Sequence, residues 1–376
     1  MHHLMDEPEG PFLVRFHHTV GTGVSPYEYD ELYRRVLLNG ISGIPKIFLD
    51  TNFWVWLRDA REDGSSERDS LLRRLRAGAR ERRLTCVLHG GTFTEFAKQQ
   101  NLAKLHAIAA IADELCEGVC LTSTEEQRLI EAWSFASEAL RVPFDGQVGR
   151  WTHVGQMFKS TYPDIDLPMT ALTRDVLYKC VSDAAHTTSL TRLISDLGDL
   201  SCFAESIDAR TVATVERLKK DSKAKGLKRS TSRVIAFRVA LEKDYAAAFE
   251  SQMKRHYEAI GAKTSPHDIN RWVGDIIDRA VDEFRVGKLG GHLASAAIFA
   301  DLFALYEVGD PHRSLTPNDW DDWDHAASAL PHCDAFFTEA HLASQLNQPN
   351  GCAARYQCKV AGSIRAALAA LDAMGL

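Results

Sequence analysis

The strongest constraint on the fold is an alternation of short apolar segments and helical patterns at both ends of the chain. Near the N-terminus, the alternation predicts strands over 46–50 and 84–88 and helices over 52–59, 67–83 and 92–103. Near the C-terminus it predicts helices over 319–330, 341–346 and 363–374 and strands over 334–338 and 356–360. Strands and helices that alternate in this way are typical of a parallel sheet covered by helices.

Between these two parts the periodicity is almost wholly helical. Ser123 and Ser265 each precede acidic residues and a long amphipathic pattern, which indicates two helix starts. We therefore expect an α/β fold whose parallel sheet, flanked by helices, is interrupted by a large all-α insertion. The expected N-terminal extension covers 1–43 and contains one helix near 27–38. The α/β domain is expected in two parts, 44–104 and 308–376, with the insertion at 105–307 between them.

Composition places the chain among soluble globular proteins, with 45% hydrophobic and 25% charged residues. The N-terminal residues lack the order of a signal peptide, and the most apolar long stretch, 292–306, contains Asp301 and is too short to span a bilayer. We expect a cytoplasmic protein that does not enter membranes. The formal charge of −7 disfavours non-specific coating of nucleic acid, which depends on phosphate neutralisation.

Acidic residues follow the predicted strands at the edge where ligands bind in parallel sheets. Asp50 ends the first strand, and Glu95 comes shortly after the second. Asp322 shares a predicted helix face with Ala326 and Ala329, and these small residues would bring that face close to the sheet. Asp319, one turn earlier, could join it, whereas Asp321 and Asp324 should point toward solvent. Each of these acids, taken alone, also fits a helix cap or a helix dipole.

The last predicted strand offers a fourth acid. Asp334 begins that strand and Thr338-Glu339 ends it, and the spacing does not choose between the two acids. Three or four carboxylates at one edge of a sheet repel each other unless cations neutralise them. Because hard divalent ions prefer oxygen ligands, Mg²⁺ or Mn²⁺ is the expected cofactor, and one or two such ions can promote phosphoryl displacement.

Four segments, FLDTNFW, TFTEFAKQ, DDWDHAASAL and DAFFTEA, resemble in order the acidic motifs of PIN-domain ribonucleases. The resemblance covers about a third of the chain, and it implies a PIN-like fold and a metal-dependent endoribonuclease. It places the family's metal-binding acids on Asp50, Glu95 and Asp322. It also places on Asn52 a small amide that orients Asp50, with Thr338 at the same rim.

The chain departs from the family pattern after the last strand, where Glu339 and then Ala340 follow Thr338. The resemblance therefore gives Asp50, Glu95, Asp322 and Asp334 as catalytic candidates. The metal-binding candidates are Asp50, Glu95, Asp322, Asp319 and Glu339. His325, within the same motif, stands isolated in the sequence and is interpreted as a hydrogen-bonded polar residue rather than a ligand.

The densest basic stretch lies inside the insertion. It would bind nucleic-acid phosphates and bring the substrate to the acidic site. Its candidate residues are Lys219, Lys220, Lys223, Lys225, Lys228, Arg229 and Arg233. The alternative for this stretch is a solvated loop between two helices. RNA is the expected substrate ahead of DNA, and a protein regulator or a second copy of the chain stays open as a further partner.

Three other functions fit parts of the pattern. One is a structure-specific DNA nuclease, because an acidic centre does not distinguish the two sugars. Another is a catalytically degenerate PIN-like protein that binds nucleic acid or a protein partner. A haloacid-dehalogenase-like phosphatase would need a second Asp where Asn52 stands. Loss of cleavage on changing Asp50 would separate a nuclease from a binding protein.

Overall fold

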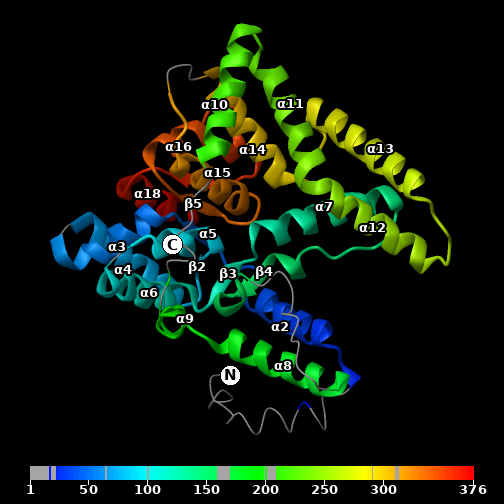
Figure 1. Ribbon diagram of the computed structural model, residues 1–376. Coiled ribbons are helices and arrows are strands. Elements are labelled where there is room, and N and C mark those ends of the chain that lie inside the picture. The colour runs from blue at the N-terminus through cyan, green and yellow to red at the C-terminus, as the bar shows by residue number, and fades with distance from the viewer. Residues whose placement is uncertain are drawn as a thin grey trace.

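Four short apolar segments form one parallel sheet in the computed structural model of the protein (Figure 1). The structure describes residues 17, 23–63, 66–99, 101–158, 170–198, 200, 209–289, 291–309 and 313–376. The strand order is β2-β1-β5-β6. The bounds are β1 Lys46–Leu49, β2 Thr85–Val87, β5 Ala335–Phe337 and β6 Lys359–Ala361. The two ends of the chain therefore build one sheet, as the alternation predicts.

The central strand β1 joins the two halves. Phe48 is in register with Val87 of β2 on one side and with Phe336 of β5 on the other. Side chains alternate across a strand, so Phe48 faces one layer of helices and its neighbours Ile47 and Leu49 face the other. All three side chains are fully buried. Burial on both faces explains why the run from Ile47 to Leu49 is continuously apolar instead of alternating with polar residues.

Helices cover both faces of this sheet. The core around Ile47 and Leu49 includes buried side chains of α3, α4, α6 and α18, whereas the core around Phe48 includes those of α14, α15 and α16. The first group spans Thr51–Asp63, Ser66–Arg80, Leu102–Cys116 and Ile364–Met374. The second group spans Ala294–Ala304, Pro317–Ala329 and Ala340–Leu346. The short α17 spans Cys352–Arg355, and β6 therefore begins at Lys359 instead of at 356, where the predicted strand begins.

The expectation that 105–307 is all helical is wrong at two strands. β3, Val119–Leu121, pairs antiparallel with β4, Trp151–His153, and Leu88 bridges to Cys120 beside β2. Moreover, α6 contributes Leu105 and Ile108 to the same core as α3 and α4. Each strand has only three residues, which is too short a run for period-two alternation to stand out from the helical patterns around it.

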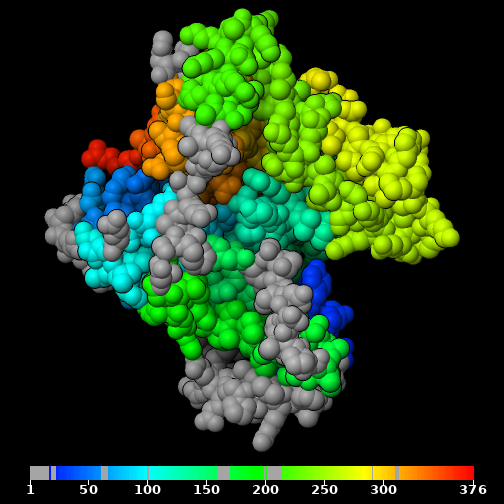
Figure 2. Space-filling view, viewed as in Figure 1, coloured from blue at the N-terminus to red at the C-terminus, as the bar shows by residue number. Residues whose placement is uncertain are grey.

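The remaining middle segment is helical and has a core of its own. Phe135, Phe237, Phe249 and Phe284 meet there, from α7, α11, α12 and α13. These helices span Thr124–Leu140, Arg229–Ala240, Ala246–Ala259 and Pro266–Arg285. In Figures 1 and 2, the segment that contains α11 to α13, coloured yellow-green to yellow, projects from the right side of the molecule. Ser123 and Ser265 cap α7 and α13, which confirms both predicted helix starts.

The other elements connect these layers. The predicted N-terminal helix is present as α2, Pro26–Ile41, with a capping box between Ser25 and Glu28. α8, α9 and α10 span Ala171–Thr187, Leu190–Leu197 and Ala209–Ala224. Single turns of 3-10 or π helix occur at Val148–Arg150, Val154–Gln156, Leu241–Tyr245 and Leu305–Gly309. Within the described ranges, every helix is too short or too polar to cross a membrane.

Candidate metal centre

Asp50 lies in the turn between β1 and α3, at the carboxyl edge of the sheet. Its backbone N–H donates to the carbonyl of Phe337 at 2.9 Å, so pairing with β5 holds the turn in place. Only 1% of the residue is exposed. The carboxylate accepts hydrogen bonds from the Thr51 N–H at 2.7 Å and from the Thr338 hydroxyl at 2.8 Å. A buried carboxylate with these donors has a fixed orientation.

Thr338 lies at the predicted rim and orients the Asp50 carboxylate, whereas the orienting role predicted for Asn52 is wrong. Thr338 follows β5, and its own N–H donates to the Ala361 carbonyl at 2.9 Å. Asn52 is exposed, and no hydrogen bond in the described structure joins it to Asp50. Asn52 is the second residue of α3, and each step along a helix turns the side chain by about 100°. The turn therefore points Asn52 away from the carboxylate of Asp50.

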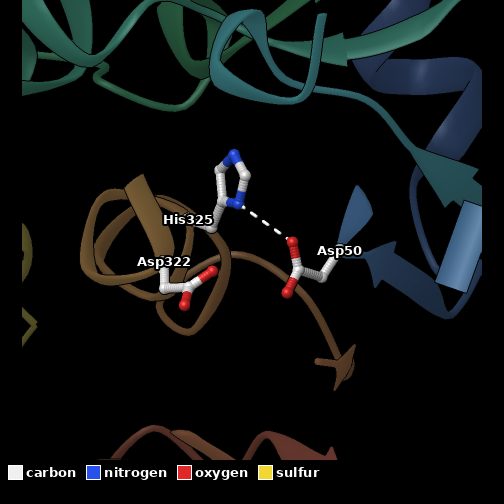
Figure 3. A group of neighbouring side chains, drawn as sticks. All are labelled: Asp50, Asp322 and His325. Carbon is white, nitrogen blue, oxygen red and sulfur yellow. Dashed lines mark hydrogen bonds and ion pairs between the residues drawn. The ribbon is translucent and has the colours of Figure 1, made fainter. Parts of the chain in front are cut away.

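Asp322 and His325 reach Asp50 from α15. They stand three residues apart on the helix and so share a face. Ligand atoms of Asp50, Asp322 and His325 all lie within 4.8 Å of one another. Figure 3 shows the carboxylates of Asp50 and Asp322 pointing toward each other, with the imidazole beside them. On the same face, Ala326 and Ala329 are fully buried, which confirms the predicted close packing of this helix.

His325 carries the charge that balances these acids in the metal-free chain. Its Nδ1 lies 3.2 Å from Oδ1 of Asp50. Burial lowers the pKa of His325, but the Asp50 hydrogen bond and the charge of Glu95 outweigh burial and raise it to about 10. Burial also acts to raise the pKa of Asp50, but the hydrogen bond to His325 lowers it overall. The two side chains therefore form an ion pair.

The charged form of Asp322 is destabilised by burial and by neighbouring carboxylates. Burial raises its pKa, and the charge of Asp50 raises it further, to about 8. In the part of the chain that the structure describes, neither Asp50 nor Asp322 forms an ion pair with Lys or Arg. The imidazolium of His325 is thus a single positive charge among several carboxylates, and a cation would relieve the remaining repulsion.

Glu95 lies at the same edge and reaches the turn that holds Asp50. It belongs to α5, Gly90–Ala97, and accepts a hydrogen bond from the Thr51 hydroxyl. Burial raises its pKa, and the charge of Asp50 adds to this effect. His89, rather than Thr92, caps this helix, so Glu95 is not the capping acid that the sequence also allowed. Glu95 thus contributes a third carboxylate to the group.

The two candidates for the fourth acid lie at opposite ends of β5. Asp334 precedes the strand, and its carboxylate accepts the Lys46 N–H at 2.8 Å, where β1 begins. Its assignment as a catalytic residue is therefore wrong, because Asp50 follows the other end of β1. Glu339 begins α16 without a side-chain bond to that helix. Its charge raises the pKa of Asp322, which places Glu339 beside the acidic group.

Asp319 is a helix cap and not a member of this group. Its carboxylate accepts from the N–H and the hydroxyl of Thr316, both at 2.7 Å, and also pairs with Arg313. Its assignment as a metal ligand is therefore wrong. Asp321 and Asp324 are half-buried, although both were expected to face solvent. Asp321 accepts a hydrogen bond from the Lys98 ammonium at 2.8 Å, and Asp324 accepts one from the Thr124 hydroxyl at 2.7 Å.

The basic stretch divides into internal and exposed residues. Lys219 is buried, donates to the Arg313 carbonyl and lies 3.9 Å from the ring centre of Tyr306. Arg233 pairs with Asp301 and lies over the ring of Phe284. A phosphate-binding role is wrong for these two, because packing holds both cationic side chains. The other candidates are exposed: Lys220, Lys223, Lys225, Lys228 and Arg229.

Sequence reasoning missed His325 as a partner of the acids. The available signal was its place three residues after Asp322, on the helix face that also carries Ala326 and Ala329. Its other ring nitrogen, Nε2, is buried without a hydrogen-bond partner in the described structure. A side chain at Gly91 would come within 2.9 Å of that nitrogen. A glycine at this position therefore lets the start of α5 approach the imidazole.

Comparisons of the chain with protein-family models, with curated proteins and with solved structures found no match. The chemistry of the site therefore has to be argued from its own donors. Asp50, Glu95, Asp322 and Glu339 supply carboxylate oxygens, the donors that Mg²⁺ and Mn²⁺ prefer. The imidazole of His325 is a donor more typical of transition metals. These carboxylates could hold a divalent ion, and His325 would act as a nitrogen donor only after losing the proton that pairs it with Asp50.

Proposed function

We propose that the protein is a divalent-metal-dependent nuclease that hydrolyses phosphodiester bonds, and that its substrate is RNA. The observation that carries the proposal is the convergence of Asp50, Asp322 and His325 within 4.8 Å at the carboxyl edge of a parallel sheet. The resemblance of the segments around these residues to the acidic motifs of PIN-domain ribonucleases supports RNA as substrate. No other feature of the site separates RNA from DNA.

Each residue at the edge has a distinct part in this proposal. Asp50 and Asp322 hold the ion, with Glu95 and Glu339 beside them. The ion supplies Lewis acidity for the phosphoryl group and lowers the pKa of bound water. The Thr338 hydroxyl and the Thr51 N–H keep the Asp50 carboxylate in one orientation, so its oxygens stay in place to bind the ion.

The five exposed basic residues of the α10–α11 region are the proposed contacts to the RNA backbone. Replacing Lys220, Lys223 and Lys225 with Ala should weaken RNA binding in the presence of EDTA and reduce its salt dependence. Three phosphate contacts correspond to a slope smaller by roughly two for a single strand. An unchanged slope would show that this region is a solvated turn.

Calorimetric titration with Mn²⁺ tests the metal centre directly. Wild-type protein should bind Mn²⁺, whereas Asp50→Asn and Asp322→Asn should not bind it at the same concentration. Asp334→Asn is the matched control, because this acid lies at the other end of the sheet. Equal binding by all four proteins would remove the site assignment.

Cleavage assays with single-stranded RNA and DNA then test the reaction. We expect RNA cleavage that needs Mn²⁺ or Mg²⁺, that survives Asp334→Asn and that disappears in Asp50→Asn. Cleavage of DNA alone would overturn the substrate. Mn²⁺ binding without cleavage of either polymer would favour the binding-protein alternative.

A further inference from the structure

A cavity lies at the amino end of the sheet, opposite the acidic group. It has a volume of about 480 Å³, and its lining includes Lys46 at the start of β1, Arg150 and Trp151 at the start of β4, and His332 before β5. Ser42, Ser134 and Gln147 add neutral hydrogen-bonding groups. None of the described residues that line it is acidic. This lining contrasts with the formal charge of −7 for the whole chain.

The two cations of this cavity lack carboxylate partners. The Nζ of Lys46 donates to the Ile44 carbonyl at 3.0 Å. The guanidinium of Arg150 donates to the Gly146 carbonyl at 3.2 Å, and its Nη1 lies 3.0 Å from a ring nitrogen of His332. Across the described ranges, neither cation is within ion-pair distance of an acid. A partly buried cation without a counter-charge attracts anions.

Acids near the cavity are engaged with other groups. Both oxygens of Glu131 accept bonds, from the Tyr245 hydroxyl at 2.9 Å and from Ser295. Asp334 accepts the backbone N–H of Lys46 and not its ammonium. Glu138 pairs with His292 at 2.8 Å. These contacts leave the positive charge of Lys46 and Arg150 directed at the cavity.

His332 adds a neutral group beside Arg150. Burial lowers the pKa of His332 well below its usual value, and the charge of Arg150 lowers it further. The imidazole is therefore uncharged at neutral pH and does not compete with Arg150 for an anion. Burial lowers the pKa of Arg150, and the charge of Glu131, which is bonded to Tyr245 and Ser295, offsets only part of this effect.

We propose that this cavity binds the phosphate group of a small phosphorylated ligand the size of a nucleoside monophosphate. Arginine offers a planar fork of donors and lysine a point charge, and both bind phosphate. The volume lies within the range of small-molecule sites. The four residues of β1 separate Lys46 from Asp50 by about 13 Å, so this site is distinct from the acidic edge. The inference does not depend on the proposed nuclease activity.

Isothermal calorimetry in EDTA tests the inference, with AMP, inorganic phosphate and adenosine as probes. EDTA removes divalent ions, so binding through the acidic edge does not contribute. Wild-type protein should bind AMP and phosphate but not adenosine. Lys46→Gln and Arg150→Lys should each weaken AMP binding at least about tenfold, since each alters a charge-assisted contact.

Two matched variants complete the experiment. Lys359→Gln removes an exposed lysine at the start of β6 that does not line the cavity, and Asp50→Asn alters the opposite edge. Both should bind AMP as the wild type does. Failure of AMP and phosphate to bind at millimolar concentration would overturn the proposal. Equal binding of adenosine and AMP would overturn it, as would loss of binding in Asp50→Asn. Circular dichroism verifies that every variant is folded.

Discussion

Buried acids occur both at the carboxyl edge of the sheet and in the helical region, by which we mean α10 to α14 and the turn that follows them, 209–309. The partners of these acids differ between the two places. In the helical region, Asp301 pairs with Arg233 and with Arg355, and Glu307 accepts bonds from the hydroxyls of Ser222 and Ser232. At the sheet edge, Asp322 has no such cation or hydroxyl donor in the described structure, and its pKa is raised to about 8.

The comparison separates acids that stabilise the fold from acids that destabilise it. A buried carboxylate with complete partners supports the packing around it, whereas carboxylates that face each other cost free energy. Proteins accept such a cost mainly where a ligand or ion offsets it. The difference between the two regions can therefore be tested with the same substitution, Asp to Asn, in each.

The largest expected effect is on catalysis by Asp50→Asn. This change replaces a charged ligand at the centre of the group with a neutral one, so cleavage of RNA with Mn²⁺ should fall by at least about a hundredfold. Single-turnover cleavage rates measure the loss. Asp301→Asn, the counterpart in the helical region, should retain the rate once the fraction of folded protein is matched. A comparable loss in both variants would remove the distinction.

The next effect is on stability in the helical region. Asp301→Asn leaves Arg233 and Arg355 without a carboxylate, and we expect the free energy of unfolding to fall by about 2 kcal/mol, given that both arginines are partly exposed. Urea unfolding followed by circular dichroism measures the change. Mn²⁺ affinity should stay at the wild-type value. A gain in stability would show that this acid is also poorly compensated.

Asp322→Asn should change stability in the opposite direction. Removing a carboxylate that faces Asp50 and Glu339 relieves repulsion, so the metal-free protein should gain about 1 kcal/mol. Thermal unfolding in EDTA measures this gain, and adding Mn²⁺ should stabilise the wild type but not the variant. Asp321→Asn is the control on the same helix, because it loses the Lys98 ion pair and should not gain stability.

The smallest effect concerns a partly buried histidine outside both regions, His153 at the end of β4. Burial lowers the pKa of His153 to about 4, in contrast to the raised pKa of His325. Between the unfolded pKa of about 6.5 and the folded one, the unfolded chain binds a proton that the folded chain does not, so stability falls as the pH falls through this window. His153→Gln should reduce the loss between pH 7 and pH 5.5 by about 1 kcal/mol. Urea unfolding at both pH values measures it, and an unchanged difference would contradict the assignment.

The sequence predicts the sheet better than it predicts the acids around it. The strands near Lys46, Thr85 and Ala335 could be recognised because clear helical patterns lie on both sides of each short apolar run. β3 and β4 escape recognition because they lie inside a long, mostly helical segment, where three residues do not stand out from the helical patterns around them. From the predicted strands and helices, Asp50, Glu95 and Asp322 could be placed at the carboxyl edge of the sheet.

Side-chain direction could not be predicted in the same way. Asp319 and Asp334 also lie near predicted strand or helix ends, but backbone N–H groups bind their carboxylates: Thr316, three residues away, binds Asp319, and Lys46, 288 residues away, binds Asp334. Asn52 is turned away by the helix that begins one residue before it. The role of His325 depends on Asp50, which is 275 residues away in the chain, and spacing on one helix does not reveal that contact.

The position of β1 between β2 and β5 has a consequence for synthesis of the chain. Asp50 directly follows β1, whose neighbour β5 is translated 286 residues later, as the difference between Leu49 and Ala335 shows. Contacts so distant in sequence form slowly and late. Asp50 and Asp322 therefore cannot meet on the ribosome until α15 and β5 have emerged, and a product truncated before α15 would lack the acidic centre.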